Sequence, residues 1–325
     1  MRKTNWRSLL PFILLAVLLP IGAYAQTAAP QASGLPFSLK PLGHNVYAAI
    51  DDAKGDAGAN AGFVIGDDGV LVIDTFENEA AAKQLLAEIR KLTKLPVKFV
   101  VNTHYHLDHV AGNAVFEQAG AVVLAQRNVF HWIHTENLKF FGKDIKPEQR
   151  AMVEALAAPK VLYDSDIQLV LGSRQILVHV YPGHTGGDSV VMIPGAKVVF
   201  CGDLFWRKTL PNLIDASTEA WMETLEDLQT TSPSAAVAYV PGHGDPGDFH
   251  DVEAFRGYLA DLRGWVKKQI KEGKTGDDLV NAVLPAVKEK YGQWNFFDYF
   301  AKPNIRDAEA ELRGKKKIPQ PAVAP

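Results

Sequence analysis

One run of six residues constrains this chain more than any other feature: His104-Tyr105-His106-Leu107-Asp108-His109. It contains three histidines and a carboxylate, and it directly follows Val97–Val101, an apolar run that predicts a buried strand. Imidazole and carboxylate groups together suit zinc, manganese or iron. The first two histidines can point the same way from an extended segment, whereas Asp108 and His109 fall where a helix is predicted to begin. The run therefore predicts a metal site at a strand end, with two groups for one ion and two for a neighbouring ion.

Three further candidate ligands each follow an apolar run and a glycine. His184 lies in Pro-Gly-His-Thr, Asp203 in Cys-Gly-Asp and His243 in Pro-Gly-His. Because glycine lets the backbone turn tightly, each side chain is expected at a strand-to-loop junction. Taken singly, each is equally well explained as a turn residue or a helix cap. Together with the first run, they complete two coordination spheres.

Strand-like and helical patterns alternate in both halves of the chain, which favours a layered α/β fold. A helix is predicted near Ala82–Leu92, another around Trp221–Leu228 with Ser217 or Thr218 as its cap, and mostly helix from about His250. The segment 130–158 looks helical and is long for a connection, so it is a candidate lid. The predicted strands are Val46–Ile50, Ala61–Ile65, Val70–Ile73, Val97–Val101, Ala121–Leu124, Gln168–Leu171, Gln175–Val180, Val190–Ile193, Lys197–Phe200 and Ala235–Val240.

Composition excludes several classes of protein. A chain of 325 residues that is 47% hydrophobic can bury a sizeable core. A formal net charge of −3 gives no reason to expect a nucleic-acid partner. The single cysteine, Cys201, excludes intrachain disulfides and cysteine-rich metal sites. Cys201 itself is interpreted as a small buried hydrophobe, with a thiolate beside the metal as the alternative. Trp206, Phe140 and Phe141 are interpreted as core residues rather than as an apolar wall of the site.

The first 25 residues are typical of a signal peptide. Arg2, Lys3 and Arg7 precede an apolar stretch that ends at Ala23-Tyr24-Ala25, so the mature chain is expected to begin at Gln26. An uncleaved membrane anchor is the alternative. Cleavage predicts a periplasmic or secreted protein without stable membrane insertion. The predicted organisation is a signal peptide (1–25), a linker (26–35), a hydrolase domain (36–248), a C-terminal helical extension (249–318) and a disordered tail (319–325).

The His-x-His-x-Asp-His run, with the separate His, Asp and His positions, resembles the metallo-β-lactamase superfamily of hydrolases. The resemblance covers about Leu35 to Gly244. It implies a four-layered αββα sandwich, with two mixed sheets face to face and the metals at one edge. It also implies two zinc ions per chain, although manganese or iron stay open. It implies these roles: His104, His106 and His184 on the first zinc; Asp108, His109 and His243 on the second; Asp203 bridging both; and Asp74 orienting the ligand loop.

The chemistry implied is attack on a small-molecule substrate by a metal-bound hydroxide, with Asp108 orienting it and taking its proton. Asp203 resembles the glyoxalase-II-like pattern, whereas dedicated β-lactamases usually carry cysteine or serine there. An ester, thioester or amide hydrolase is therefore favoured. A β-lactamase and a non-catalytic metal-binding accessory protein of a periplasmic redox system are the alternatives. Arg207 and Lys208, close after Asp203, are candidates to bind a substrate carboxylate. The sequence leaves the oligomeric state open.

Overall fold

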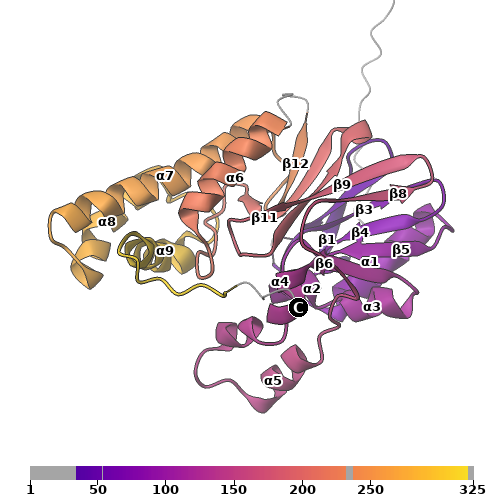
Figure 1. Cartoon of the computed structure of the whole chain (residues 1–325), viewed down its shortest axis with the longest axis horizontal. Helices are drawn as coiled ribbons and strands as arrows, with labels where there is room; N and C mark the ends of the chain where they lie inside the picture. The colour runs from indigo at the N-terminus through magenta and orange to yellow at the C-terminus, as the bar shows by residue number, and fades with distance from the viewer. Residues whose placement is uncertain (1–33, 53, 232–236, 321–325) are drawn as a thin grey trace, which may run out of the picture. The chain divides into compact units, whose positions relative to one another are not determined.

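The computed structural model describes residues 34–52, 54–231 and 237–320, so the predicted signal peptide and most of the predicted linker and C-terminal tail lie outside the described residues. Within these ranges, seven strands form a first sheet (Figure 1), antiparallel from β1 to β4 and parallel from β4 to β7. Its strands, in spatial order, are β1 (Phe37–Pro41), β2 (Val46–Asp51), β3 (Ala61–Ile65), β4 (Val70–Ile73), β5 (Val97–Val101), β6 (Val122–Gln126) and β7 (Val161–Tyr163).

Five described strands form a second sheet in the spatial order β12-β11-β10-β9-β8. Only the β11–β12 pair is parallel, so this sheet is mixed as well. Its strands are β8 (Ile167–Leu171), β9 (Arg174–Tyr181), β10 (Asp188–Ile193), β11 (Val198–Trp206) and β12 (Ala238–His243).

The two sheets pack face to face through one apolar cluster to which both contribute. In β4, Leu71 and Ile73 belong to this cluster, whereas Val70 and Val72 point to the opposite face and pack in another. Successive side chains of a strand alternate between faces, so a strand that is buried on both faces must be apolar throughout. This explains the unbroken apolar runs that the sequence shows.

Helices cover both outer faces. The cluster outside the first sheet includes α1 (Glu79–Leu92) and α3 (Asn113–Gln118). The cluster outside the second sheet draws on α6 (Thr218–Thr231) and on three C-terminal helices, drawn in orange to yellow in Figure 1: α7 (Phe249–Lys271), α8 (Gly276–Tyr291) and α9 (Phe297–Leu312). The predicted αββα sandwich with a helical C-terminal extension is confirmed.

The C-terminal helices share their core with the second sheet. One apolar cluster joins side chains of β10 to β12 with those of α7 to α9, for example Tyr239 with Phe255 and Ile305. The predicted boundary between residues 248 and 249 lies at the N-cap of α7, where the Asp248 carboxylate accepts hydrogen bonds from the backbone of His250 and Asp251. Among the described helices, none combines the length and apolar character needed to cross a bilayer.

The segment 130–158 is helical, as predicted. It contains the second half of α4 (Arg127–Trp132), a 3-10 helix η1 (Glu136–Phe141) and α5 (Pro147–Glu154), all between β6 and β7. Its function as a lid stays a prediction. Two other short helices complete the described elements, α2 (Leu107–Val110) and η2 (Pro194–Ala196).

Some predicted elements differ from the structure. The two edge strands of the first sheet, β1 and β7, were not predicted. The strand expected at Lys197–Phe200 continues to Trp206, because the backbone at Gly202 (φ 51°) shifts the register against β12 and lets pairing resume beyond it. Of the two candidate caps of α6, Ser217 accepts a hydrogen bond from the backbone of Ala220 (3.4 Å).

Candidate metal centre

Hydrogen bonds hold the start of the loop after β5 in place, just ahead of the first candidate ligand in the sequence. Asn102 and Asn113 exchange two side-chain hydrogen bonds of 2.9 Å, and Asn102 also donates its backbone N–H to Leu124 of β6 (3.0 Å). His106 is the N-cap residue of α2, whereas Asp108 and His109 lie within that helix. The side chains of the run therefore project from a clamped strand end, as the sequence predicts.

The other three candidate ligands reach the same place from the second sheet. His184 lies in the loop between β9 and β10, and His243 is the last residue of β12. Asp203 lies inside β11, so its predicted position at a strand-to-loop junction is wrong. The reason is again Gly202, whose left-handed backbone displaces the pairing without ending the strand.

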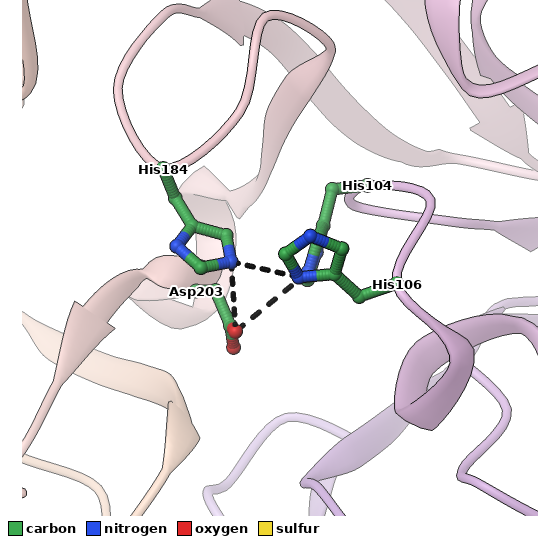
Figure 2. Close-up of side chains that lie close together, drawn as sticks. All are labelled: His104, His106, His184 and Asp203. Carbon is green, nitrogen blue, oxygen red and sulfur yellow. Dashed lines mark hydrogen bonds and ion pairs between the residues drawn. The ribbon is translucent and has the colours of Figure 1, made fainter. Parts of the chain in front are cut away.

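Four side chains form a first group of possible ligands (Figure 2). The imidazole rings of His104, His106 and His184 turn toward the carboxylate of Asp203. Asp203 Oδ2 lies 3.2 Å from His184 Nε2 and 3.7 Å from His104 Nε2, and His106 Nδ1 lies 2.9 Å from His184 Nε2. All four residues are buried.

Three side chains form a second group beside it: Asp108, His109 and His243. His243 Nε2 lies 3.3 Å from Asp108 Oδ2, and His109 Nε2 lies 3.7 Å from the same oxygen. The other oxygen of Asp203 faces this group, since Oδ1 lies 3.1 Å from His109 Nε2 and 3.5 Å from His243 Nε2. Asp203 therefore presents one carboxylate oxygen to each group.

Several of these atoms are buried without a hydrogen-bond partner among the described residues: Nε2 of His104, His109 and His243, and Oδ1 of Asp203. Buried polar atoms are normally paired, so this concentration of unpaired ones needs an explanation. Two cations, one in each group, would satisfy all four atoms. Nitrogen and carboxylate donors in sets of this size suit a divalent metal such as zinc. The residues present thus fit a metal centre.

Asp74 binds the loop that carries the ligands and contacts His109 of the second group. It is buried, and its carboxylate accepts hydrogen bonds from the Thr103 backbone (2.8 Å) and hydroxyl (2.7 Å). Its Oδ2 also lies 2.8 Å from His109 Nδ1. A carboxylate in that position keeps a proton on His109 Nδ1, so that Nε2 is the nitrogen that gives up its proton to bind a metal.

Sequence reasoning missed a second carboxylate of this kind, Asp215. It is buried, and its Oδ2 lies 3.4 Å from His106 Nε2. The same oxygen accepts a hydrogen bond from the Tyr105 hydroxyl. Lys139 of η1 pairs with its other oxygen at 2.5 Å. The pKa of Asp215 stays well below the usual value despite burial, because His106, Lys139 and Tyr105 stabilise its charge. Since 76 residues separate Asp215 from Lys139, no local pattern marks this network.

The two groups differ in electrostatics. Burial lowers the pKa of His106 to about 4, and it lowers the pKa of His104 well below the ordinary value. In the second group, burial acts the same way, but the charges of Asp203 and Asp108 outweigh it: the pKa of His243 rises to about 9, and that of His109 rises well above its ordinary value. At neutral pH the metal-free protein therefore has neutral histidines at positions 104 and 106 and charged ones at 109 and 243.

Other predicted residues have different surroundings. Arg207 forms an ion pair with Asp251 of α7 (2.8 Å), and Lys208 is exposed. Among the described residues, neither side chain forms an ion pair or a hydrogen bond with the two groups, so their function in substrate binding stays a prediction. Cys201 is buried in the cluster outside the second sheet, and burial raises the pKa of its thiol. This agrees with its interpretation as a buried hydrophobe.

Comparisons with known proteins agree with this geometry. A family model of the metallo-beta-lactamase superfamily matches residues 55–243. A linear primary-alkylsulfatase of Pseudomonas sp. (strain ATCC 19151) is 24% identical over 275 residues and covers 69% of this chain, which spans only about half (51%) of that relative. A type 2 metallo-beta-lactamase of Bacteroides fragilis is 23% identical over 250 residues, or 74% of this chain and 92% of the relative.

Solved structures show the same fold. A metallo-beta-lactamase from Pontibacter korlensis matches with a TM-score of 0.58 and 25% identity, over 69% of this chain and 99% of that one. The DIM-1 metallo-beta-lactamase matches with a TM-score of 0.56 and 21% identity, over 69% of this chain and 97% of that one. About a third of this chain thus lies outside each match.

Proposed function

This chain belongs to the metallo-β-lactamase superfamily of metallo-hydrolases, and from that premise we propose that it binds two zinc ions and hydrolyses an ester, thioester or amide-type small molecule. The observation that carries the proposal is the pair of ligand groups that share Asp203 and leave four buried donor atoms without hydrogen-bond partners among the described residues. Bound there, divalent cations supply Lewis-acid chemistry that activates water and polarises a carbonyl oxygen.

Asp108 is our candidate catalytic base. Its side chain is 27% exposed, whereas those of His243 and His109 are 9% and 0% exposed, so Asp108 is the most exposed of the ligand candidates. His109 and His243 hold the pKa of Asp108 below its ordinary value despite burial. At neutral pH its carboxylate is therefore ionised. In that form it can orient a water molecule through a hydrogen bond and accept its proton.

The test compares Asp108→Asn with wild type after both have been loaded with zinc and their metal content measured. The substrate panel is a thioester, a lactone, a β-lactam, a phosphodiester and an alkyl sulfate. We expect Asp108→Asn to fold normally and to lose turnover by about 100-fold or more. Asp67→Asn is the control, because this exposed carboxylate accepts its hydrogen bonds from Ser173 and belongs to neither ligand group. If metal-loaded wild type turned over none of the five, a non-catalytic metal-binding accessory protein would replace our proposal.

β-Lactam hydrolysis is the second candidate function. It is favoured by the similarity to metallo-beta-lactamases over nearly their full length. Asp203 weighs against it, since the dedicated β-lactamases that the sequence resembles usually carry cysteine or serine there. Nitrocefin separates the two candidates. Rapid nitrocefin turnover together with inert thioesters and lactones would favour the β-lactamase.

We also propose that the protein is exported after cleavage behind Ala25, on the strength of the basic, apolar and small-residue pattern at its N-terminus. Intact-mass measurement of the exported protein is expected to place the N-terminus at Gln26. A mature chain that still begins at Met1 would contradict the proposal.

A further inference from the structure

Aromatic side chains flank the candidate metal centre. Trp206 stacks on the His243 ring, with centroids 4.0 Å apart and an interplanar angle of 26°. Phe296 meets the same histidine (6.1 Å) and is 42% exposed. Against the first group, Phe140 of η1 contacts the edge of His106 (5.0 Å) and is 38% exposed, so its interpretation as a core residue is wrong. Each ligand group therefore has one solvent-exposed phenylalanine beside it.

Phe296 comes from the part of the chain beyond the family match, which ends at residue 243. Its neighbour Asn295 is paired with the loop after β11: Asn295 donates its backbone N–H to Lys208 (2.9 Å) and accepts one from Leu210 (2.9 Å). This short bridge fixes the start of α9 against the centre. The C-terminal extension thus brings one side chain to the site.

The backbone of Phe296 is unfavourable for its own side chain. Its φ and ψ are 59° and 15°, a left-handed conformation that bulky residues rarely adopt. It is also the N-cap residue of α9 and makes no side-chain cap hydrogen bond, where asparagine, aspartate or serine is preferred. Its ring also packs on Phe300 (5.9 Å) and Trp206 (6.3 Å), but an exposed aromatic residue that satisfies neither local rule points to a function beyond packing.

We propose that Phe296 forms an apolar wall for the substrate, so that the enzyme selects molecules whose scissile bond carries an alkyl or aryl group. This inference rests on the proposed hydrolase function. A substrate held near Asp108 and His243 would bury its apolar group against Phe296. Each buried methylene group is worth about 0.8 kcal/mol, a factor of about four in kcat/KM. The C-terminal extension thereby acts as a specificity element.

Phe296→Asn tests the proposal without harming the fold, because asparagine tolerates the left-handed backbone and is a good N-cap. We expect an unchanged or higher Tm and unchanged metal content. Wild type should prefer p-nitrophenyl hexanoate to the acetate by tenfold or more in kcat/KM, and the variant should lose most of that preference. The control is Val170→Ala on β8, at the edge of the second sheet opposite β12, where the side chain is 53% exposed; it should keep the preference.

An unchanged chain-length preference in Phe296→Asn would overturn the proposal, as would a wild type that hydrolyses acetate and hexanoate equally well. If wild type hydrolysed no ester, the proposed ester-hydrolase function would fail separately. Calorimetric binding of hexanoate and acetate ions to the zinc-loaded protein would then decide the inference. Tighter hexanoate binding that Phe296→Asn abolishes would support it, and equal affinities would refute it.

Discussion

Replacing Asp74 by asparagine should empty one metal position and spare the other. The Asp74 carboxylate accepts hydrogen bonds from the Thr103 backbone and hydroxyl, and faces His109 Nδ1 at 2.8 Å. In Asp74→Asn, the amide oxygen must take the place beside the backbone N–H, because an NH₂ group there would oppose another donor. The amide nitrogen then faces His109 Nδ1. This ring nitrogen has to accept a hydrogen bond from the amide, so it cannot carry a proton.

His109 would consequently lose its proton from Nδ1 and keep the one on Nε2, the atom that lies 3.1 Å from Asp203 Oδ1. A protonated Nε2 cannot bind a metal. Loss of such an orienting partner typically lowers metal affinity by about 10–100-fold. The Thr103 hydroxyl can rotate to accept, so the fold should survive. Asp74→Ala is a poorer test, because three unpaired buried donors would cost about 3–9 kcal/mol at about 1–3 kcal/mol each.

Calorimetric titration of the metal-free proteins with zinc measures the effect. Wild type should show two binding events, and Asp74→Asn should retain the first with unchanged affinity and weaken the second. The matched control is Asp67→Asn, since Asp67 accepts the same pair of bonds from a backbone N–H (2.7 Å) and a hydroxyl (2.6 Å), both of Ser173, on the surface. Two tight events in Asp74→Asn would refute the tautomer argument.

Three other predictions follow from the same geometry. First, the raised pKa values of His109 and His243 stabilise the metal-free protein fully below their ordinary pKa of 6.5, and this stabilisation is lost as pH rises through the raised values, about 9 for His243. The Tm should therefore fall over that interval, and zinc binding there should release protons, which calorimetry in two buffers measures; a pH-independent Tm would contradict this. Second, Gly242→Ala places Cβ 1.8 Å from Asp203 Oδ1 and should displace this ligand and lower zinc stoichiometry. Gly264→Ala, with open space around it, is the control and should bind zinc as wild type does. Two zinc ions in both variants would refute the prediction that Gly242 has to lie close to Asp203. Third, Asp215→Asn should weaken zinc at His106 by about tenfold in chelator competition, and unchanged affinity would show that Asp215 does not orient that ring.

The strands that bear the ligands could be predicted because they are buried on both faces. β4 is apolar and buried throughout, β5 has Lys98 as its one polar residue, and the polar run begins where β5 ends. The two missed strands are the edges of the first sheet. β1 is half-exposed and ends at Pro41, and β7 has three residues, of which Val161 is 45% exposed. An edge strand buries fewer side chains, so its apolar pattern is weak.

The ligand groups could be predicted from residue types alone, because metal binding restricts each position to a few side chains. The position of Asp203 within β11 could not, since it depends on how Gly202 shifts the pairing with another strand. Asp215 was missed for a related reason. Its partners Tyr105 and Lys139 lie 110 and 76 residues away, and an isolated aspartate has many uses.

Phe296 shows what separates a predictable ligand from an unpredictable specificity residue. A phenylalanine in a sequence is most often a core residue, and only its exposure, its left-handed backbone and its distance to His243 distinguish this one. The neighbouring Asn295 forms the bridge to the loop after β11, and this bridge joins segments with no shared sequence pattern. Substrate preference within a common metal centre therefore depends on tertiary contacts of the extension. A relative with identical ligands but another residue at the start of this helix should prefer different substrates.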